Sequence, residues 1–213
     1  MKRLLLATTL LVGLAASAHA DLIASFSQNA SLTPTITATD DGTTTTFGAT
    51  DASTSITTGL SGVIPAALFS LTAHSISAVT VLGTQIIQLY SGQFCFTSAP
   101  GCTGINYISG VFTDATFGAA GGPGLTVNVN NPPDTLVLTS DVVDPSRLGG
   151  PSTFNLNFAN LTNSLHVDGM TIAAFTADFA GNISASQVVP EPLPLAVLGM
   201  GLLGLGMVRR ART

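Results

Sequence analysis

GLTVNVNNPPDTLVLT, residues 124–139, contains two runs with the pattern of extended chain, separated by a turn signal. In the first run, apolar residues alternate with Thr or Asn at every second position from 125 to 130, which is the period of a strand with one buried face. Residues 131–134, NPPD, predict a turn, because these residue types favour turn geometry. In the second run Leu136 and Leu138 flank Val137, which is typical of a more fully buried strand.

The same period of two recurs along the middle of the chain. Phe154, Leu156 and Phe158 alternate with asparagines, and a further alternating run covers residues 172–179. Clusters of Gly, Pro, Asn and Asp separate the runs, the eleven phenylalanines are spread over many of them, and long helix-forming runs are absent. Residues 21–187 are therefore predicted to form one all-β domain, an antiparallel β-sandwich of jelly-roll or Ig-like type with roughly eight to ten strands.

Two segments of this predicted domain have a less regular pattern. Ser, Thr and β-branched residues dominate residues 66–82, which favours a strand over a short helix. Residues 43–58 are rich in Thr and low in complexity, and we predict a solvated hairpin at a sheet edge for them.

Charge is scarce and unevenly distributed. The chain of 213 residues is 46% hydrophobic and 8% charged, and its only lysine is Lys2. Between residues 21 and 189 there are ten aspartates and one arginine, Arg147, for a net formal charge of −9. Nucleic-acid binding needs basic patches that replace phosphate counterions, so we expect no nucleic-acid partner.

Residues 1–20 have the three parts of a secretory signal peptide. A Lys-Arg pair follows the first methionine, and residues 4–16 form an apolar segment too short for an ordinary transmembrane span. Residues 18–20, AHA, place small side chains at the two positions that signal peptidase reads. We therefore predict export through the Sec translocon with cleavage before Asp21. An uncleaved N-terminal anchor and a buried apolar helix are the alternatives.

Residues 188–213 have a different three-part pattern. Pro190, Glu191 and Pro192 precede an uncharged, Gly- and Leu-rich run over residues 193–208, and basic residues end the chain (Arg209, Arg210 and Arg212). As a helix the apolar run reaches about 24 Å, less than a hydrocarbon core of about 30 Å, so we expect a single helix that inserts transiently in the inner membrane. The arginines favour the cytoplasmic side for that end, and the prolines keep the preceding segment extended.

This order of motif, apolar helix and basic end resembles a PEP-CTERM sorting signal. The resemblance implies that exosortase, a membrane-embedded enzyme, reads the tail and cuts it near Pro190-Glu191-Pro192. It also implies delivery of the body to the cell surface or extracellular matrix of a bacterium that makes exopolysaccharide. A plain C-terminal membrane anchor is the alternative. The resemblance covers the tail alone and implies nothing direct about residues 21–187.

Cys95 and Cys102 are the only cysteines, and they bracket a segment with a Pro-Gly turn signal. In an exported protein this spacing predicts one local disulfide that pins a hairpin. A free thiol pair and a two-cysteine metal site are the alternatives, and the metal site has no histidine nearby in the sequence.

The aspartates offer one candidate for metal binding. Asp40 with Asp41, and Asp141 with Asp144, place two carboxylates close together in predicted loops, and oxygen ligands of this kind suit Ca²⁺. Neither pair matches an EF-hand, and solvated turn residues are the competing interpretation. No other metal and no cofactor is expected.

Catalytic motifs are absent from the sequence. It contains no HExxH zinc motif and no G-x-S-x-G elbow, and His74 and His166 are the histidines that remain after the leader is removed. We therefore expect a non-catalytic surface or matrix protein associated with exopolysaccharide or biofilm. A carbohydrate- or calcium-binding adhesion module is the alternative, and a secreted hydrolase that uses His74 or His166 is a lesser one.

Overall fold

The computed structural model describes residues 20–29, 35–58, 62–83, 85–118, 123–128 and 133–186, which belong to one compact unit. Strands dominate these ranges, and no α-helix occurs in them, so the predicted all-β class is confirmed. The elements are β1 (Ala20–Gln28), β2 (Ile36–Asp40), β3 (Thr45–Thr58), β4 (Gly62–Ser75), β5 (Thr80–Leu82), β6 (Gln85–Ala99), β7 (Thr103–Gly118), β8 (Gly124–Asn128), β9 (Thr135–Thr139), the 3-10 turn η1 (Pro145–Arg147), β10 (Ser152–Ala159), β11 (Val167–Asp168), β12 (Thr171–Ile172) and β13 (Phe175–Ser186).

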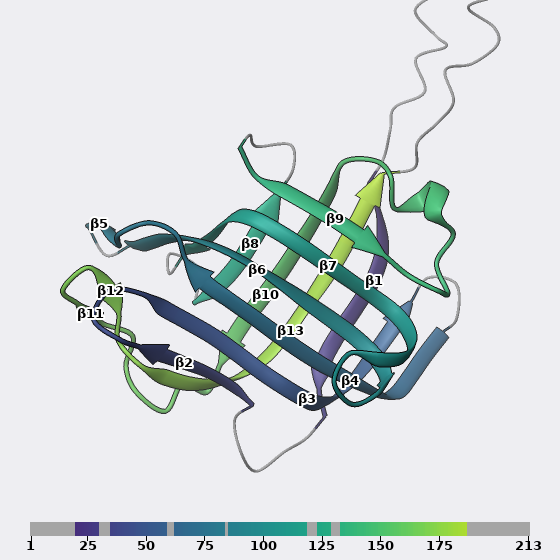
Figure 1. Ribbon diagram of the computed structural model, residues 1–213, viewed down its shortest axis with the longest axis horizontal. Helices are drawn as coiled ribbons and strands as arrows, with labels where there is room; N and C mark the ends of the chain where they lie inside the picture. Colours follow the sequence, from purple (N-terminus) through teal and green to yellow (C-terminus); the bar gives the residue numbers. More distant parts are fainter. Residues whose placement is uncertain are drawn as a thin grey trace, which may run out of the picture. The chain divides into compact units, whose positions relative to one another are not determined.

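The strands close into a barrel instead of forming two packed sheets (Figure 1). Eight antiparallel strands pair in the order β6-β4-β3-β1-β13-β10-β8-β7, and β7 pairs back with β6. The first and last described strands are neighbours, with Ala20 opposite Ser186. The predicted sandwich is therefore wrong, because alternation shows which side chains share a face but not whether the end strands of a sheet pair with each other.

Long, bent strands allow this closure. β3, β4, β6 and β7 have 14, 14, 15 and 16 residues, and bulges interrupt their pairing. Asp51 in β3 and Asp114 in β7 adopt left-handed backbone at two of these bulges, with φ of 49° and 57°. A bulge bends a strand and increases its twist, which a small barrel requires.

Three strands extend the ring. β5 pairs with β6, β9 pairs with β7, and β2 pairs with both β3 and β13. In β9, Leu136 and Leu138 are 8% exposed whereas Val137 is 65% exposed. The prediction of a more fully buried strand at Val137 is therefore wrong, because β9 lies outside the ring and one of its faces is exposed to solvent.

The Thr-rich stretch also differs from its prediction. Residues 45–58 form β3, which lies in the barrel wall between β4 and β1 and is no edge hairpin. Its alternate positions carry Phe47 and Ile56 into the core, and small threonines at Thr45 and Thr54 are buried beside them. Most of residues 66–82 form strands, as expected: residues 66–75 belong to β4 and residues 80–82 form β5.

Aromatic rings fill the barrel. All eleven phenylalanines and Tyr90 are buried, which confirms that the strands contribute anchors to a common core. Phe96 lies 4.6 Å from Phe26 and 4.7 Å from Phe69 between ring centroids, and Phe47 stacks on Tyr90 at 4.4 Å. Burial in this aromatic environment raises the pKa of Tyr90 far above its usual value. An eight-stranded barrel is wide enough either for side chains to fill or for one small ligand, and here aromatic side chains occupy the interior.

The predicted targeting segments lie outside the described residues. These are residues 1–19 of the signal peptide and residues 188–213 of the sorting signal, with the motif Pro190, Glu191 and Pro192 and the basic residues Arg209, Arg210 and Arg212. Within the ranges that the structure describes, no helix has the length and apolar character needed to cross a membrane.

Candidate functional site

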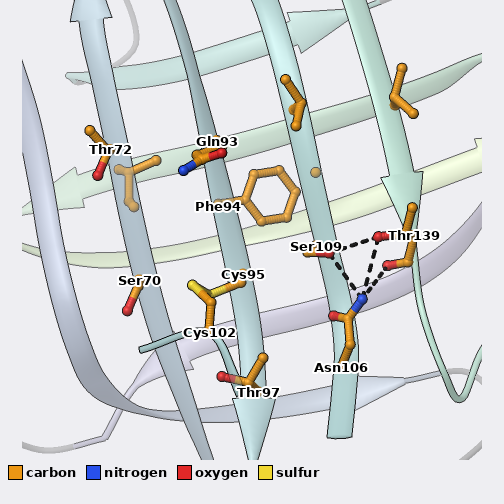
Figure 2. Close-up of a pocket in the computed structure, with 14 residues that line it drawn as sticks. Ser70, Thr72, Gln93, Phe94, Cys95, Thr97, Cys102, Asn106, Ser109 and Thr139 are labelled. Atoms are coloured by element: carbon orange, nitrogen blue, oxygen red, sulfur yellow. Dashed lines mark hydrogen bonds between the residues drawn. A yellow bond between two sulfur atoms is a disulfide. The ribbon is translucent and has the colours of Figure 1, made fainter. Parts of the chain in front are cut away.

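A groove of about 340 Å³ lies on the outer face of the barrel across β4, β6, β7 and β9 (Figure 2). The strand register aligns four small side chains across it. Ser70 is opposite Cys95, Cys95 is opposite Ser109, and Ser109 is opposite Thr139. These short side chains form the floor, because they leave space that larger residues would fill.

A second row of side chains borders the floor. It lies two residues further along each strand and consists of Thr72, Gln93, Val111 and Val137. The described residues that line the groove carry hydroxyl, amide, aliphatic, aromatic and disulfide groups and no ionisable side chain.

The predicted disulfide closes one end of the groove. Cys95 and Cys102 are bonded, with their Cα atoms 5.8 Å apart, so this prediction is confirmed. The bond joins β6 to the tip of the β6–β7 hairpin, and Figure 2 shows it between the side chains of Ser70 and Asn106. Cys95 is buried, whereas Cys102 is exposed and has left-handed backbone with φ of 57°.

Asp51 of β3 holds the tip of the β6–β7 hairpin through hydrogen bonds. Its carboxylate Oδ1 accepts hydrogen bonds from the Gly101 N–H at 2.8 Å and from the Ser70 hydroxyl at 3.2 Å. The Asp51 N–H in turn donates to the Ser70 hydroxyl at 3.0 Å. The left-handed conformation at this bulge is uncommon for a residue with a side chain, and it directs the carboxylate at the loop. A carboxylate from β3 therefore holds the loop that ends the groove.

A network of uncharged groups connects the floor residues Ser109 and Thr139 to Asn106. Asn106 Nδ2 donates to Ser109 Oγ at 3.0 Å and to the Thr139 carbonyl oxygen at 3.3 Å, and the Ser109 and Thr139 hydroxyls lie 2.8 Å apart. The Asn106 backbone pairs with Asp141, which accepts the Asn106 N–H at Oδ2 and donates its own N–H to the Asn106 carbonyl, both at 2.8 Å. Asn106 Oδ1 is buried and has no hydrogen-bond partner among the residues that the structure describes. An acceptor in that state is uncommon in a folded protein.

The predicted calcium ligands lie in two separate turns. Asp40 is the last residue of β2 and Asp41 follows it in the β2–β3 turn, whereas Asp141 and Asp144 occupy the connection from β9 to β10. Their carboxylates accept local hydrogen bonds, including Gly42 N–H to Asp40 at 2.9 Å. Hydrogen bonds also lower two pKa values, that of Asp41 chiefly through the Thr43 hydroxyl and that of Asp144 chiefly through the Ser146 N–H.

These turn contacts fit the interpretation of the aspartates as turn residues, and calcium binding stays a prediction. Among the residues that the structure describes, no group of three or more His, Cys, Asp or Glu side chains is placed to hold a metal ion.

Neither histidine lines the groove. His74 is exposed on β4, opposite Thr46 and Ser91 in the two neighbouring strands. His166 is exposed in the loop before β11, and its Nδ1 lies 2.9 Å from the Ser164 carbonyl oxygen. A hydrolytic role for either histidine stays a prediction.

A second, more open hollow of about 450 Å³ lies over β2 and β3. Its lining consists of threonines with one glycine and one alanine, namely Thr35, Thr37, Thr39, Thr46, Gly48, Ala49 and Thr50. This hollow presents hydroxyl groups alone, without the amides and large aliphatic side chains of the first groove.

Comparison with known proteins gives no further assignment: no protein-family model, no curated protein and no solved structure matches this chain. The groove was also missed by the sequence analysis, apart from its two cysteines. It depends on positions 70, 95, 109 and 139 being neighbours, which the pairing register decides. The available signal was the alternation of small polar residues with apolar ones along these strands.

Proposed function

We propose that this chain is an exported, non-catalytic protein of a bacterial cell surface or extracellular matrix, associated with exopolysaccharide or biofilm. The observation that carries the proposal is the combination of the leader at residues 1–20 with the three-part tail at residues 188–213. The proposed partners are the Sec translocon, signal peptidase and exosortase. Residues 193–208 would insert transiently in the inner membrane before the body is released.

Two properties of the barrel support this role. A disulfide such as Cys95–Cys102 persists in the oxidising conditions outside the cytoplasm. The outer face is rich in hydroxyl groups that bridge neighbouring strands, as in the Thr113–Thr135 pair at 2.6 Å and the Ser109–Thr139 pair at 2.8 Å. Uncharged hydroxyl groups are compatible with a hydrated polysaccharide matrix, where both partners exchange hydrogen bonds with water.

Intact-mass measurement of the protein recovered from the surface of its native host tests the proposal. The expected mass lacks residues 1–20 and part of the tail, and it is two hydrogen atoms below that of the reduced protein because of the disulfide. A cytosolic product that keeps the leader and the tail would contradict the proposal.

The groove favours a second candidate function, a carbohydrate-binding adhesion module. If the module binds carbohydrate, glycans should raise the melting temperature of the protein. If it binds calcium instead, EDTA should lower that melting temperature. The third candidate, a secreted hydrolase, requires turnover that is lost in His74→Ala or His166→Ala.

A further inference from the structure

We propose that the outer groove across β4, β6, β7 and β9 binds a neutral polysaccharide. The inference rests on the proposed function, because it names the site through which an extracellular barrel would contact its matrix. Four properties of the groove point to this ligand class: its polar groups, its apolar border, its charge and its rigidity.

The polar groups match a polyol. Gln93 and Asn106 supply amides, and Ser70, Ser109 and Thr139 supply hydroxyls, so donors and acceptors are interleaved over the surface. Sugar hydroxyl groups have the same dual character and can bond to either kind of group. Asn106, a lining residue, also has an Oδ1 that is buried and has no hydrogen-bond partner among the described residues.

The apolar border matches the other side of a sugar ring. Val111 and Val137 are neighbours across β7 and β9 and are 56% and 65% exposed. The Cys95–Cys102 disulfide adds apolar surface at the end of the floor. A pyranose has a face of C–H groups that can pack on such a surface while its hydroxyl groups reach the amides. Most small-ligand sites likewise combine apolar surface with a few polar groups.

Charge selects against anionic polymers. The described groove lining carries no ionisable group, and the nearest carboxylates named here, Asp51 and Asp141, contact lining residues directly. A uronate or sulfate would approach these negative charges without a cation to compensate. A neutral polymer meets no such penalty.

The groove is held in shape before any ligand binds. The disulfide fixes the hairpin tip covalently, and the Asp51 carboxylate holds Gly101 and Ser70. Two non-glycine residues in left-handed conformation, Asp51 and Cys102, belong to this support. Such backbone is retained where surrounding contacts enforce it, and preorganisation reduces the entropy lost on binding. The Thr-lined second hollow has no comparable cross-link among its lining residues.

The test uses the full chain, oxidised and kept in a detergent without a sugar headgroup. Affinity gel electrophoresis measures binding to dextran and mannan as neutral polymers and to alginate as an anionic one. We expect retardation by at least one neutral polymer and none by alginate. Thr72→Trp places a large ring in the groove from an exposed position and should weaken that binding by about ten-fold or more.

Two further variants keep the test decisive. Thr37→Trp is the matched control, since Thr37 is an exposed strand threonine that lines the second hollow, and its binding should stay within about two-fold of the parent. Gln93→Ala removes one exposed lining amide without adding bulk and should also weaken binding. Circular dichroism confirms that each variant is folded.

Three results would overturn the inference: no retardation by either neutral polymer, equal retardation by alginate, or full binding by both Thr72→Trp and Gln93→Ala. Loss of binding in Thr37→Trp alone is a fourth result that would overturn it, and it would move the site to the second hollow. The proposed function is judged separately by the mass of the exported protein. A correctly processed surface protein that binds no neutral polymer therefore overturns the groove assignment alone.

Discussion

Removal of the Cys95–Cys102 disulfide should lower the stability of the barrel by an amount that follows from the length of the closed loop. The bonded residues are seven apart in sequence. For a loop of about eight residues, the cross-link removes about 8 cal/mol/K of entropy from the unfolded chain. This loss of entropy stabilises the folded state by about 2.5 kcal/mol at 25 °C. Each kcal/mol moves the melting temperature of a domain of this size by about 2–4 °C. The C95A/C102A variant should therefore melt about 5–10 °C below the parent.

A matched variant separates the cross-link from backbone strain. Cys102 has φ of 57°, a conformation that glycine adopts readily and alanine does not. C95A/C102G should therefore regain about 1 kcal/mol relative to C95A/C102A. Thermal and urea unfolding followed by far-ultraviolet circular dichroism measure both differences. A double-alanine variant that melts at the parent temperature would refute the loop-entropy argument, and a glycine variant less stable than the alanine variant would refute the strain argument.

Three further predictions concern packing, pH and proteolysis. Gly181→Ala should destabilise the barrel by about 1–3 kcal/mol, because its Cβ would overlap a carbonyl oxygen of β10, whereas Gly118→Ala meets open space and should shift the urea midpoint little. Asp41 has a lowered pKa because the Thr43 hydroxyl binds its carboxylate, so its stabilising effect is present above the unfolded pKa near 3.8 and is lost as pH falls through the lower folded value. Acid titration of the parent against Asp41→Ala should show the two stabilities converging there. Between residues 21 and 189 trypsin has one target, Arg147, whose side chain is 19% exposed and lies 3.5 Å from an aspartate. Native protein should resist trypsin on a gel while the unfolded chain is cut there, and rapid native cleavage would contradict the placement of Arg147.

The local structure of the barrel was largely predictable from the sequence. The alternation at Phe154, Leu156 and Phe158 predicted which side chains lie inside, and all three are buried in β10. The pairing of Cys95 with Cys102 followed from their spacing, since a short loop with a turn signal brings its ends together. These features depend on neighbours in the sequence, which is why one sequence was sufficient.

Closure of the barrel and the groove depend on pairing between distant segments. The bulge at Asp51 shifts β3 against β4, and no local pattern around Asp51 announces that shift. The contact of β1 with β13 joins positions more than 150 residues apart, as in the Ala20–Ser186 pair. The burial predicted for Val137 was wrong for the same reason, because the exposure of this side chain depends on which strand lies beside β9. Alternation determines on which face of the sheet each residue lies, but it does not determine which strands pair with each other.

The adjacency of β1 and β13 also determines how the barrel responds to mechanical load. The two strands are antiparallel, and Ala20 and Ser186 face each other at the same end of the pair. Tension between these two positions therefore acts first on the hydrogen bonds at the end of the pair. The strands then separate one hydrogen bond at a time, whereas in shear all the hydrogen bonds would resist the force together. A tether attached at one of the two positions applies no such peeling force between them.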